Sequence, residues 1–358
     1  MRVGVEVGGT FTDLVLIEDG KLRVSKVPST PKNPDKGALN AIDAAGISPS
    51  SIEDLVHGST VATNAVLERK GAKVCFFVTQ GTRDVLLLQR HDKRSIYDLH
   101  YRKPEPVASR RDTFEIPERM DADGNVVRVL DELAVTGIVE AALGSGDFDA
   151  VAICFLNGYL NPSHEESVAC IVRDVDPQIS ITCSHEVTRE FREYERASTT
   201  TLAAYVQPVI EGYLGRFVEA LTEKGFVGQF SVMQSNGGRM PAEAMARNAI
   251  AALFSGPAAG VIGALRQVEA SGAHDLITLD MGGTSTDVSL ISGGVPDLAS
   301  MTKIDGLPVK TPVIDIVTVG AGGGSIGWID DGGLLRVGPQ SAGAGPGPAC
   351  YGRGGTVP

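Results

Sequence analysis

The chain reads Glu6-Val7-Gly8-Gly9-Thr10-Phe11-Thr12-Asp13 near its start and Asp280-Met281-Gly282-Gly283-Thr284-Ser285-Thr286-Asp287 much later. Both stretches follow the pattern acid-x-Gly-Gly-Thr-x-Thr-Asp and lie between apolar runs, which is typical of a tight β-hairpin. Glycines allow positive φ angles and leave no Cβ in the way, so successive N–H groups can close on an anion. The repeat therefore predicts two phosphate-binding hairpins, one in each lobe. The alternative is that each stretch is only a hairpin.

Each hairpin supplies its own set of candidate groups. The predicted phosphate ligands lie in the two turns: Gly8, Gly9, Thr10 and Thr12 in the first, and Gly282, Gly283, Thr284 and Thr286 in the second. The threonine hydroxyls are expected to add donors at the rim of each turn. A carboxylate does not bind phosphate, but it can hold a hydrated cation that does. Glu6 and Asp280, which precede the turns, are therefore candidates for a metal contact through water.

Size and composition limit the classes of function. The chain has 358 residues, 42% of them hydrophobic, and a net charge of −12. This length predicts at least two domains with cores of their own. Lys and Arg are scattered, which argues against a nucleic-acid surface or a membrane-binding patch, and no apolar run approaches a membrane span. We expect a cytoplasmic protein whose five cysteines are reduced core residues.

The order of predicted elements indicates an α/β protein of two lobes. Strands at 2–7, 12–18 and 21–27 form a meander, and alternating helices and strands follow to residue 183. We place the N-terminal lobe at 1–186, with a Pro-rich excursion from the sheet near 104–130, and an incomplete second lobe at 187–358. A long helical region, 189–224, is expected to be interrupted at Pro208. The second lobe is expected to open with a strand at 229–233.

Small residues recur in the segment that follows this strand. Gly256, Ala259, Gly260 and Gly263 have helical spacing, which predicts a smooth stripe on one face of a helix. We expect this stripe to let another helix pass at close range, as at a hinge between lobes.

Candidate substrate contacts come from loops that follow strands. They are His57, Arg90, His91 and Asp92. Loops at one edge of a sheet often carry binding residues. The alternatives are that the segment after His57 only caps a helix and that the charged segment 89–99 is a solvated loop.

At this point the sequence resembles the hydantoinase A / 5-oxoprolinase / acetone carboxylase family. The resemblance spans essentially the whole chain. Besides the two hairpins, it is carried by His57 to Asn64, Glu193 to Arg196, Ser235 to Gly238, Ser255 to Gly260, Gly320 to Ser325 and Pro346 to Gly352. It implies the two-lobed fold of actin, Hsp70 and hexokinase, with ribonuclease H-like lobes and the helix at 256–263 as a connector between them.

The resemblance also implies a chemistry. ATP and Mg²⁺ would bind at the two hairpins, with Glu6 and Asp280 contacting the metal through water. Asp13, Asp280 and Asp287 are the implied catalytic residues, and Asp13 or Asp287 would orient the loops or the transferred phosphoryl group. The implied activity is ATP-dependent hydrolysis of a cyclic amide such as 5-oxoproline, a hydantoin or a related lactam. It would require a B-type hydantoinase subunit, and hence a hetero-oligomer.

Two alternative functions stay open, namely an ATP-dependent ketone carboxylase subunit and a nucleotide-gated regulatory module.

The sequence departs from the family pattern in two ways. Glu6 stands where this fold usually has Asp, and the family pattern continues beyond Pro358. The later adenosine motif of the fold is absent, so we expect either that this chain is the N-terminal part of a longer protein or that another chain supplies the adenine pocket. We expect this chain alone to be inactive.

Overall fold

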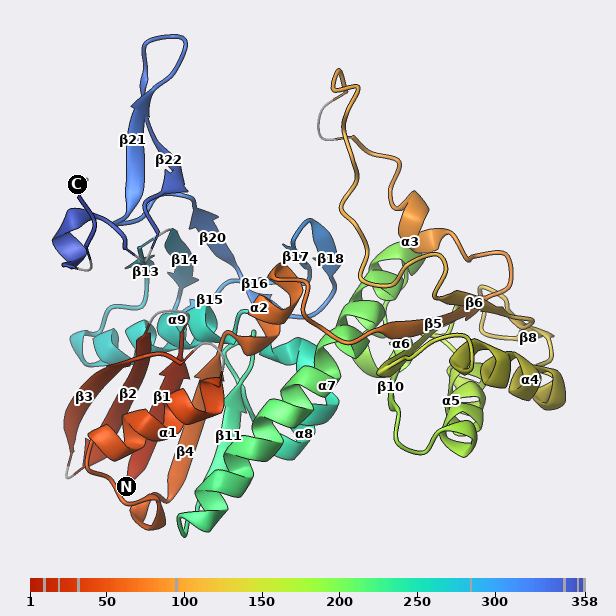
Figure 1. The fold of residues 1–358 in the computed structure, drawn as a ribbon, viewed down its shortest axis with the longest axis horizontal. Coiled ribbons are helices and arrows are strands. Elements are labelled where there is room, and N and C mark those ends of the chain that lie inside the picture. The colour runs from red at the N-terminus through yellow and green to blue at the C-terminus, as the bar shows by residue number, and fades with distance from the viewer. Residues whose placement is uncertain are drawn as a thin grey trace.

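The computed structural model describes residues 1–8, 11–18, 20–30, 33–93, 96–283, 285–343, 346–352 and 354–356. In this part the chain is an α/β protein with two main sheets, which lie side by side and share one long helix (Figure 1). A third, smaller sheet lies above the first, and two projections extend from the same side of the molecule (Figure 1). No described helix is both long and apolar enough to cross a membrane.

The first sheet has six strands in the order β12-β11-β4-β1-β2-β3. The strands are β1 (Arg2–Val7), β2 (Phe11–Glu18), β3 (Lys21–Pro28), β4 (Asp54–Ser59), β11 (Gln229–Met233) and β12 (Arg239–Pro241). β1, β4 and β11 run parallel, whereas β2 is antiparallel to both of its neighbours. Alternate residues of β1, Val3, Val5 and Val7, pack with α1 (Pro34–Ala44) because successive strand residues face opposite sides.

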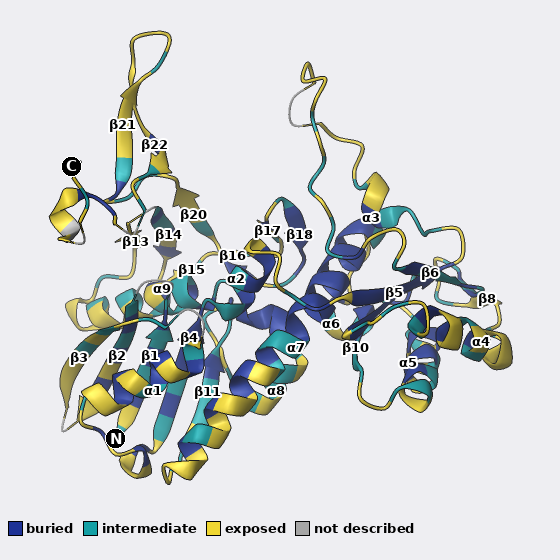
Figure 2. Cartoon of the chain, in the orientation of Figure 1, coloured by how far each residue is buried: buried dark blue, intermediate teal, exposed yellow. Residues whose placement is uncertain are grey.

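The second sheet is parallel throughout, in the order β10-β9-β5-β6. Its strands are β5 (Val74–Thr79), β6 (Thr113–Ile116), β9 (Ala150–Cys154) and β10 (Ser180–Cys183). Every residue of β5 and β9 is buried, as expected for parallel strands covered on both faces (Figure 2). One face packs against α4 (Glu132–Leu143) and α5 (Ser163–Val175). Nearby lie the short strands β7 (Arg119–Met120) and β8 (Val126–Arg128).

Part of the segment 104–130 belongs to this sheet, which corrects our expectation of an excursion. β6 pairs with β5 in parallel register, Phe76 opposite Thr113. β6 is only four residues long, and its local sequence did not show that it pairs with β5.

Helix α7 (Glu193–Glu223) joins the two main sheets. It is continuous through Pro208, so the expected interruption is wrong. A proline inside a helix costs about 3 kcal/mol, and burial of the residues around it, including Val206 and Ile210, offsets that cost. Shorter helices flank α7: α2 (Val61–Leu67), α3 (Val85–Leu88), α6 (Ser184–Val187) and α8 (Ala242–Arg247). Single 3-10 turns are η1 (Pro49–Ser51), η2 (Ala249–Ala252), η3 (Glu269–Ser271) and η4 (Ala349–Tyr351).

The third sheet contains the second hairpin. β13 (Leu276–Met281) pairs with β14 (Thr286–Ser292), which also pairs with β15 (Val295–Pro296) and β20 (Ile316–Val319). Helix α9 (Ser255–Val268) packs against this sheet and against β4 of the first sheet. Short ribbons complete the chain: β16 (Leu298–Ala299) with β19 (Val313–Ile314), β17 (Thr302–Ile304) with β18 (Leu307–Val309), and β21 (Ser325–Ile329) with β22 (Leu335–Ser341).

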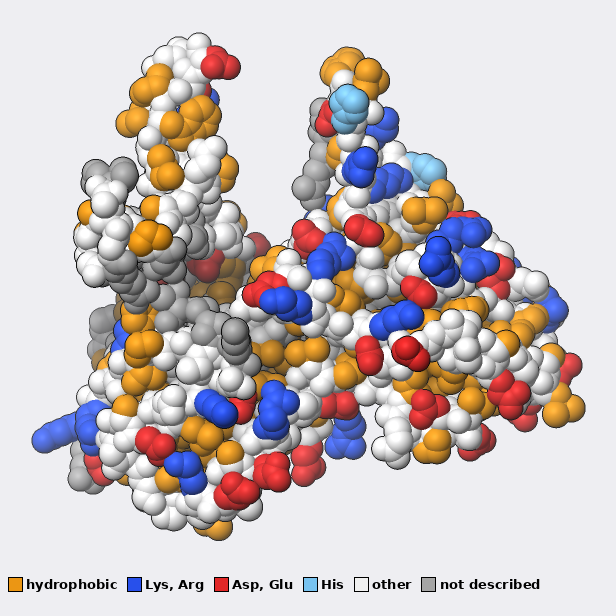
Figure 3. All heavy atoms as spheres, in the orientation of Figure 1, with side chains coloured by type: hydrophobic (Ala, Val, Ile, Leu, Met, Phe, Trp, Pro, Cys, Tyr) orange, Lys and Arg blue, Asp and Glu red, His pale blue; other side chains and the backbone are white. Residues whose placement is uncertain are grey.

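Apolar side chains are exposed on both projections (Figure 3). One is the loop after α3, where Tyr97 and Leu99 are 94% and 96% exposed, and the other is the β21–β22 ribbon, where Leu335 is 71% exposed.

The five cysteines differ in burial. Cys75, Cys154 and Cys183 are buried, but Cys170 and Cys350 are exposed, so the expectation that all five are core residues is wrong.

The predicted boundary at residue 187 does not coincide with a sheet boundary. β11 follows that position in the chain, yet it pairs with β4 in the first sheet. The second sheet is therefore inserted in sequence between two strands of the first.

Candidate functional site

In their described residues the two hairpins share one strand register and one hydrogen bond across the turn. In the first hairpin Glu6 lies opposite Asp13, and in the second Asp280 lies opposite Asp287. The Gly8 N–H donates to the Phe11 carbonyl at 3.0 Å. The matching bond in the second turn, from the Gly282 N–H to the Ser285 carbonyl, is 2.9 Å. The repeated sequence pattern thus folds into repeated hairpins of one register, as predicted.

The threonine after each turn stabilises its own hairpin. Thr12 is fully buried, and its hydroxyl bonds the Ser29 hydroxyl, which donates to the Gly8 carbonyl at 2.7 Å. Thr286 is 7% exposed and donates to the Ala321 carbonyl at 2.5 Å. The expectation that these two hydroxyls are donors at the rim is therefore wrong for this structure. An inward-facing strand position requires their burial.

A glycine-rich segment that the sequence analysis did not assign to the site supports the second turn. The Gly323 and Gly324 N–H groups donate to the Gly282 and Gly283 carbonyls at 2.9 and 2.7 Å. A Cβ on Gly324 would lie 2.9 Å from the Gly283 carbonyl oxygen, so this approach requires glycine. The glycine richness of 320–324 was the available signal, but sequence alone did not show what the segment contacts.

Three of the predicted phosphate ligands, Gly9, Thr10 and Thr284, lie outside the described residues. Among the others, Gly8 is half-buried, whereas Gly282 and Gly283 are exposed. The phosphate-binding roles of all these residues stay predictions.

The four carboxylates of the hairpins have different surroundings. The Oε2 atom of Glu6 is buried without a hydrogen-bond partner. Its burial, together with the nearby charge of Asp13, raises the pKa of the Glu6 carboxyl to about 7. Asp13 itself forms an ion pair with Lys26 at 2.8 Å. In the second hairpin Asp280 is exposed, and Asp287 accepts a hydrogen bond from Thr318 at 2.6 Å.

A cavity adjoins each hairpin. The first has a volume of about 440 Å³ and is lined by Gly8, Thr60, Asn64 and Tyr213, among others. The second has a volume of about 400 Å³ and lies between α9 and the third sheet, where Asp280 and Asp287 line it. Each cavity could admit a small molecule beside a glycine turn.

The expectation that another helix passes close to the small-residue stripe of α9 stays a prediction. A Cβ added at Gly260 or Gly263 would meet no described atom within 4 Å. Gly256 differs, because a Cβ there would lie 2.6 Å from Oε1 of Glu6. Close approach thus occurs at one position, and its partner is a side chain of the first hairpin.

The predicted substrate contacts are not gathered at one place. His57 is fully buried between the Val5 carbonyl and the Tyr213 hydroxyl, so its prediction as a substrate contact is wrong for this structure. Arg90 binds Glu195 through two hydrogen bonds of 2.9 and 2.5 Å. Glu195 and Tyr213 lie on the same helix 18 residues apart, which corresponds to about 27 Å.

The remaining two, His91 and Asp92, are exposed at the base of the long loop. Nothing in the described part of the chain places them at either hairpin, so their role stays a prediction. Arg90 and its neighbours follow the short helix α3. The loop that begins there extends away from the second sheet (Figure 1).

No group of three or more His, Cys, Asp or Glu residues in the described ranges is arranged to hold a metal ion.

Family models match nearly the whole chain. The model described as the hydantoinase/oxoprolinase N-terminal region matches residues 2–176, and the hydantoinase/oxoprolinase model matches residues 196–358. Caprolactamase subunit alpha of Pseudomonas jessenii is 37% identical over 100% of this chain and 53% of its own length. Acetophenone carboxylase gamma subunit of Aromatoleum aromaticum is 34% identical over 99% of this chain and 51% of its own length.

The solved structure of the ATP-dependent caprolactamase from Pseudomonas jessenii has the same fold over the entire chain. The TM-score is 0.90 at 36% identity, and the match covers 100% of this chain and 53% of that one. The chain thus spans about half the length of these relatives. Together with the two hairpins of one register, these matches show that the chain belongs to the hydantoinase/oxoprolinase family.

Proposed function

We propose that the two glycine turns bind the phosphates of ATP, from opposite lobes of a fold like that of actin, Hsp70 and hexokinase. The observation that supports this proposal most directly is the matching register and turn hydrogen bond of the two hairpins. The strand order β3-β2-β1-β4-β11, with only β2 antiparallel, is the arrangement expected of a ribonuclease H-like lobe. The turns at Gly8 and at Gly282–Gly283 would surround the phosphates, with the Gly283 N–H as a donor, because the Gly8 and Gly282 N–H groups close their own turns.

We propose Mg²⁺ as the accompanying cation. Glu6 fits this role because its buried Oε2 atom has no hydrogen-bond partner among the described residues, and Asp280 offers an exposed carboxylate at the equivalent position of the second hairpin. Mg²⁺ in such sites usually takes one or two carboxylates and completes its shell with water and phosphate oxygens. The bound ion would neutralise phosphate charge during transfer. Asp13 and Asp287, opposite these two carboxylates, would orient the turns.

The proposed reaction opens a cyclic amide at the expense of ATP. The γ-phosphoryl group passes from ATP to the amide oxygen and leaves ADP. A first water then adds to the activated carbon, the ring C–N bond breaks, and a second water hydrolyses the acyl phosphate. Placement and charge neutralisation supply most of the catalysis in such transfers. The relative named caprolactamase supports this substrate class.

We further propose that the protein acts in the cytoplasm with a B-type subunit. Two relatives carry subunit designations, alpha for the caprolactamase and gamma for the carboxylase, which supports a hetero-oligomer.

A second candidate is an ATP-dependent carboxylase subunit. The 34% identity to acetophenone carboxylase gamma subunit favours it. ADP formation that requires both a ketone and bicarbonate would support the carboxylase, whereas ADP formation with a lactam alone would support the hydrolase.

The test is ADP formation by the full-length protein together with its B-type subunit, with 5-oxoproline, hydantoins, caprolactam, or a ketone plus bicarbonate. We expect Asp280→Asn to lower the rate at least about 100-fold, because it removes the carboxylate that would position the metal. Asp331→Asn, the same change in an exposed residue near the tip of the β21–β22 ribbon, should leave the rate unchanged. An Asp280→Asn protein with the normal rate would contradict the proposed site.

A further inference from the structure

The Glu6 carboxyl group lies in a narrow slot between two glycines from different parts of the fold. A Cβ added at Gly58 of β4 would lie 1.8 Å from Oε2 of Glu6 and 3.0 Å from its Cδ. A Cβ added at Gly256, in the first turn of α9, would lie 2.6 Å from Oε1. Real Cβ atoms essentially never come within 3.0 Å of another atom, so a Cβ at either position would displace the Glu6 carboxyl from its observed place. The carboxyl is thus confined from the side of β4 and from the side of α9.

Independent contacts hold the start of α9 against the end of β4. The Ser255 hydroxyl donates to the Ser59 carbonyl at 3.2 Å, and Ser255 is fully buried. The Phe254 N–H donates to the Thr63 hydroxyl, also at 3.2 Å. The first bond ties the start of α9 to the end of β4, and the second ties the residue before α9 to α2, so the position of α9 beside Glu6 does not depend on the Glu6 side chain.

The same helix supports the second hairpin further along its length. Ala258 and Val261 of α9 form a buried cluster with Ile291 of β14 and Ile314 of β19. The first turn of α9 therefore meets the first hairpin through Glu6, and its next turns carry the sheet of the second hairpin (Figure 1).

We infer that Gly58 and Gly256 are positioning residues: their missing side chains admit the Glu6 carboxyl between β4 and α9 and thereby set the separation of the two hairpins. The part that concerns nucleotide rests on the proposed function. The packing part does not, because it follows from the three-way contact of Glu6, Gly58 and Gly256 alone. Glu6 is one methylene longer than Asp, so its carboxyl reaches further from the β1 backbone than the carboxyl of Asp would.

The test compares alanine substitutions in the full-length protein. Gly58→Ala and Gly256→Ala introduce a methyl into the slot, whereas Gly4→Ala in β1 and Gly263→Ala in α9 are matched controls. The nearest atom to a Cβ at Gly4 is 3.9 Å away, and a Cβ at Gly263 meets nothing within 4 Å. The measurements are the Tm, and the Kd for MgADP by calorimetry.

We expect each slot variant to have a Tm at least about 3 °C below that of its control and a Kd for MgADP at least about tenfold weaker. Glu6→Asp withdraws the carboxyl by roughly one C–C bond, about 1.5 Å. The double variant Gly58→Ala, Glu6→Asp should therefore regain most of the lost Tm, and should bind MgADP more tightly than Gly58→Ala alone. A general weakening of β4 would show no such rescue.

Slot variants with the Tm and Kd of their controls would overturn the inference, and so would failure of Glu6→Asp to rescue Gly58→Ala. Wild-type protein that binds no MgADP would reject the proposed function instead. In that case the Tm comparison and its rescue would still decide whether the slot exists.

Discussion

His57 lies on β4 directly before Gly58, yet its ring points to the opposite side of the sheet because successive strand residues face opposite ways. Its Nδ1–H donates to the Val5 carbonyl at 3.0 Å, which leaves Nε2 to accept from the Tyr213 hydroxyl at 2.6 Å. Full burial disfavours a charged imidazole and lowers the pKa of His57 to about 4. Gly58, by contrast, faces Glu6 and the slot. Of these two adjacent residues, His57 thus packs in the core and Gly58 faces the candidate site.

This burial predicts a pH dependence of stability. Because the pKa of His57 is lower in the folded state, the unfolded chain binds a proton that the folded chain does not as the pH falls below about 6.5. The contribution of neutral His57 is therefore present above pH 6.5 and is lost as the pH falls towards 4. Between pH 7.5 and 5, it should lower the free energy of unfolding by about 2 kcal/mol.

Urea unfolding at the two pH values checks this expectation. His57→Gln should be less stable at pH 7.5 but should lose about 2 kcal/mol less than wild type on acidification. His100→Gln, the same change at an exposed position, should keep the wild-type dependence. Equal acid sensitivity of wild type and His57→Gln would contradict the prediction.

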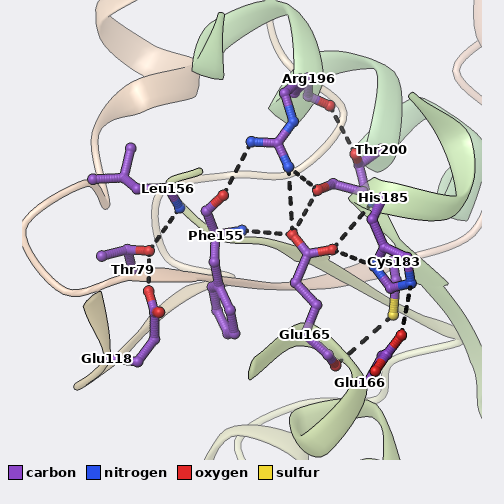
Figure 4. Close-up of polar contacts among 11 residues, drawn as sticks. Thr79, Glu118, Phe155, Leu156, Glu165, Glu166, Cys183, His185, Arg196 and Thr200 are labelled. Atoms are coloured by element: carbon purple, nitrogen blue, oxygen red, sulfur yellow. Dashed lines mark hydrogen bonds and ion pairs between the residues drawn. The ribbon is translucent and has the colours of Figure 1, made fainter. Parts of the chain in front are cut away.

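At the level of elements, the carboxyl ends of the second sheet meet in a buried polar network (Figure 4). Parallel strands bring their ends to one edge, and here Glu165 of α5 accepts hydrogen bonds from the Phe155 N–H at 2.9 Å and from the Ser184 hydroxyl at 2.5 Å. Its other oxygen accepts from Nδ1 of His185 at 2.7 Å. Arg196 of α7 is fully buried and lies 3.5 Å from Glu165. The network therefore attaches α7 to the edge of the sheet.

Removal of the Glu165 charge should be strongly destabilising. Glu165→Gln would leave the Arg196 guanidinium buried without its counter-charge, which typically costs 3–5 kcal/mol, so we expect a loss of about 4 kcal/mol in the free energy of unfolding. Glu166→Gln changes the next residue, whose side chain is 61% exposed, and should alter stability by less than about 0.5 kcal/mol. Chemical denaturation of both variants makes the comparison, and similar values for the two would show that the network contributes little.

For the whole molecule, α7 makes the two main sheets one cooperative structure. Its first half packs on the second sheet, where Leu202 joins a cluster with Phe76 of β5. Its second half packs on the first sheet, where Leu221 joins a cluster with Val5 of β1. A rigid helix that belongs to both clusters cannot lose one of them without exposing apolar surface of the other.

We therefore expect a single unfolding transition for the two sheets. Leu202→Ala and Leu221→Ala, both fully buried in wild type, should each cost about 2–5 kcal/mol and should shift that transition as a whole. Differential scanning calorimetry with hydrogen exchange would detect the alternative. If Leu202→Ala opened only the second sheet and left exchange in β1 and β4 unchanged, the cooperative model would be wrong.

Local sequence signals predicted much of the fold. Glycine pairs between apolar runs predicted both hairpins, and the predicted strands at 2–7 and 229–233 have the observed bounds. These features depend on neighbours in the chain, namely on side-chain alternation and on the backbone freedom of glycine. For the same reason the carboxylates before the two turns were recognised as one pattern.

Only the tertiary structure decided what each local pattern contacts. It buried His57, continued α7 through Pro208, returned β11 to the first sheet and placed Gly256 against Glu6. Each of these outcomes depends on residues far apart in the chain, whose packing energy exceeds local preference. The sequence by itself therefore determined the two hairpins, whereas long-range packing determined which of the predicted side chains are buried and which are exposed.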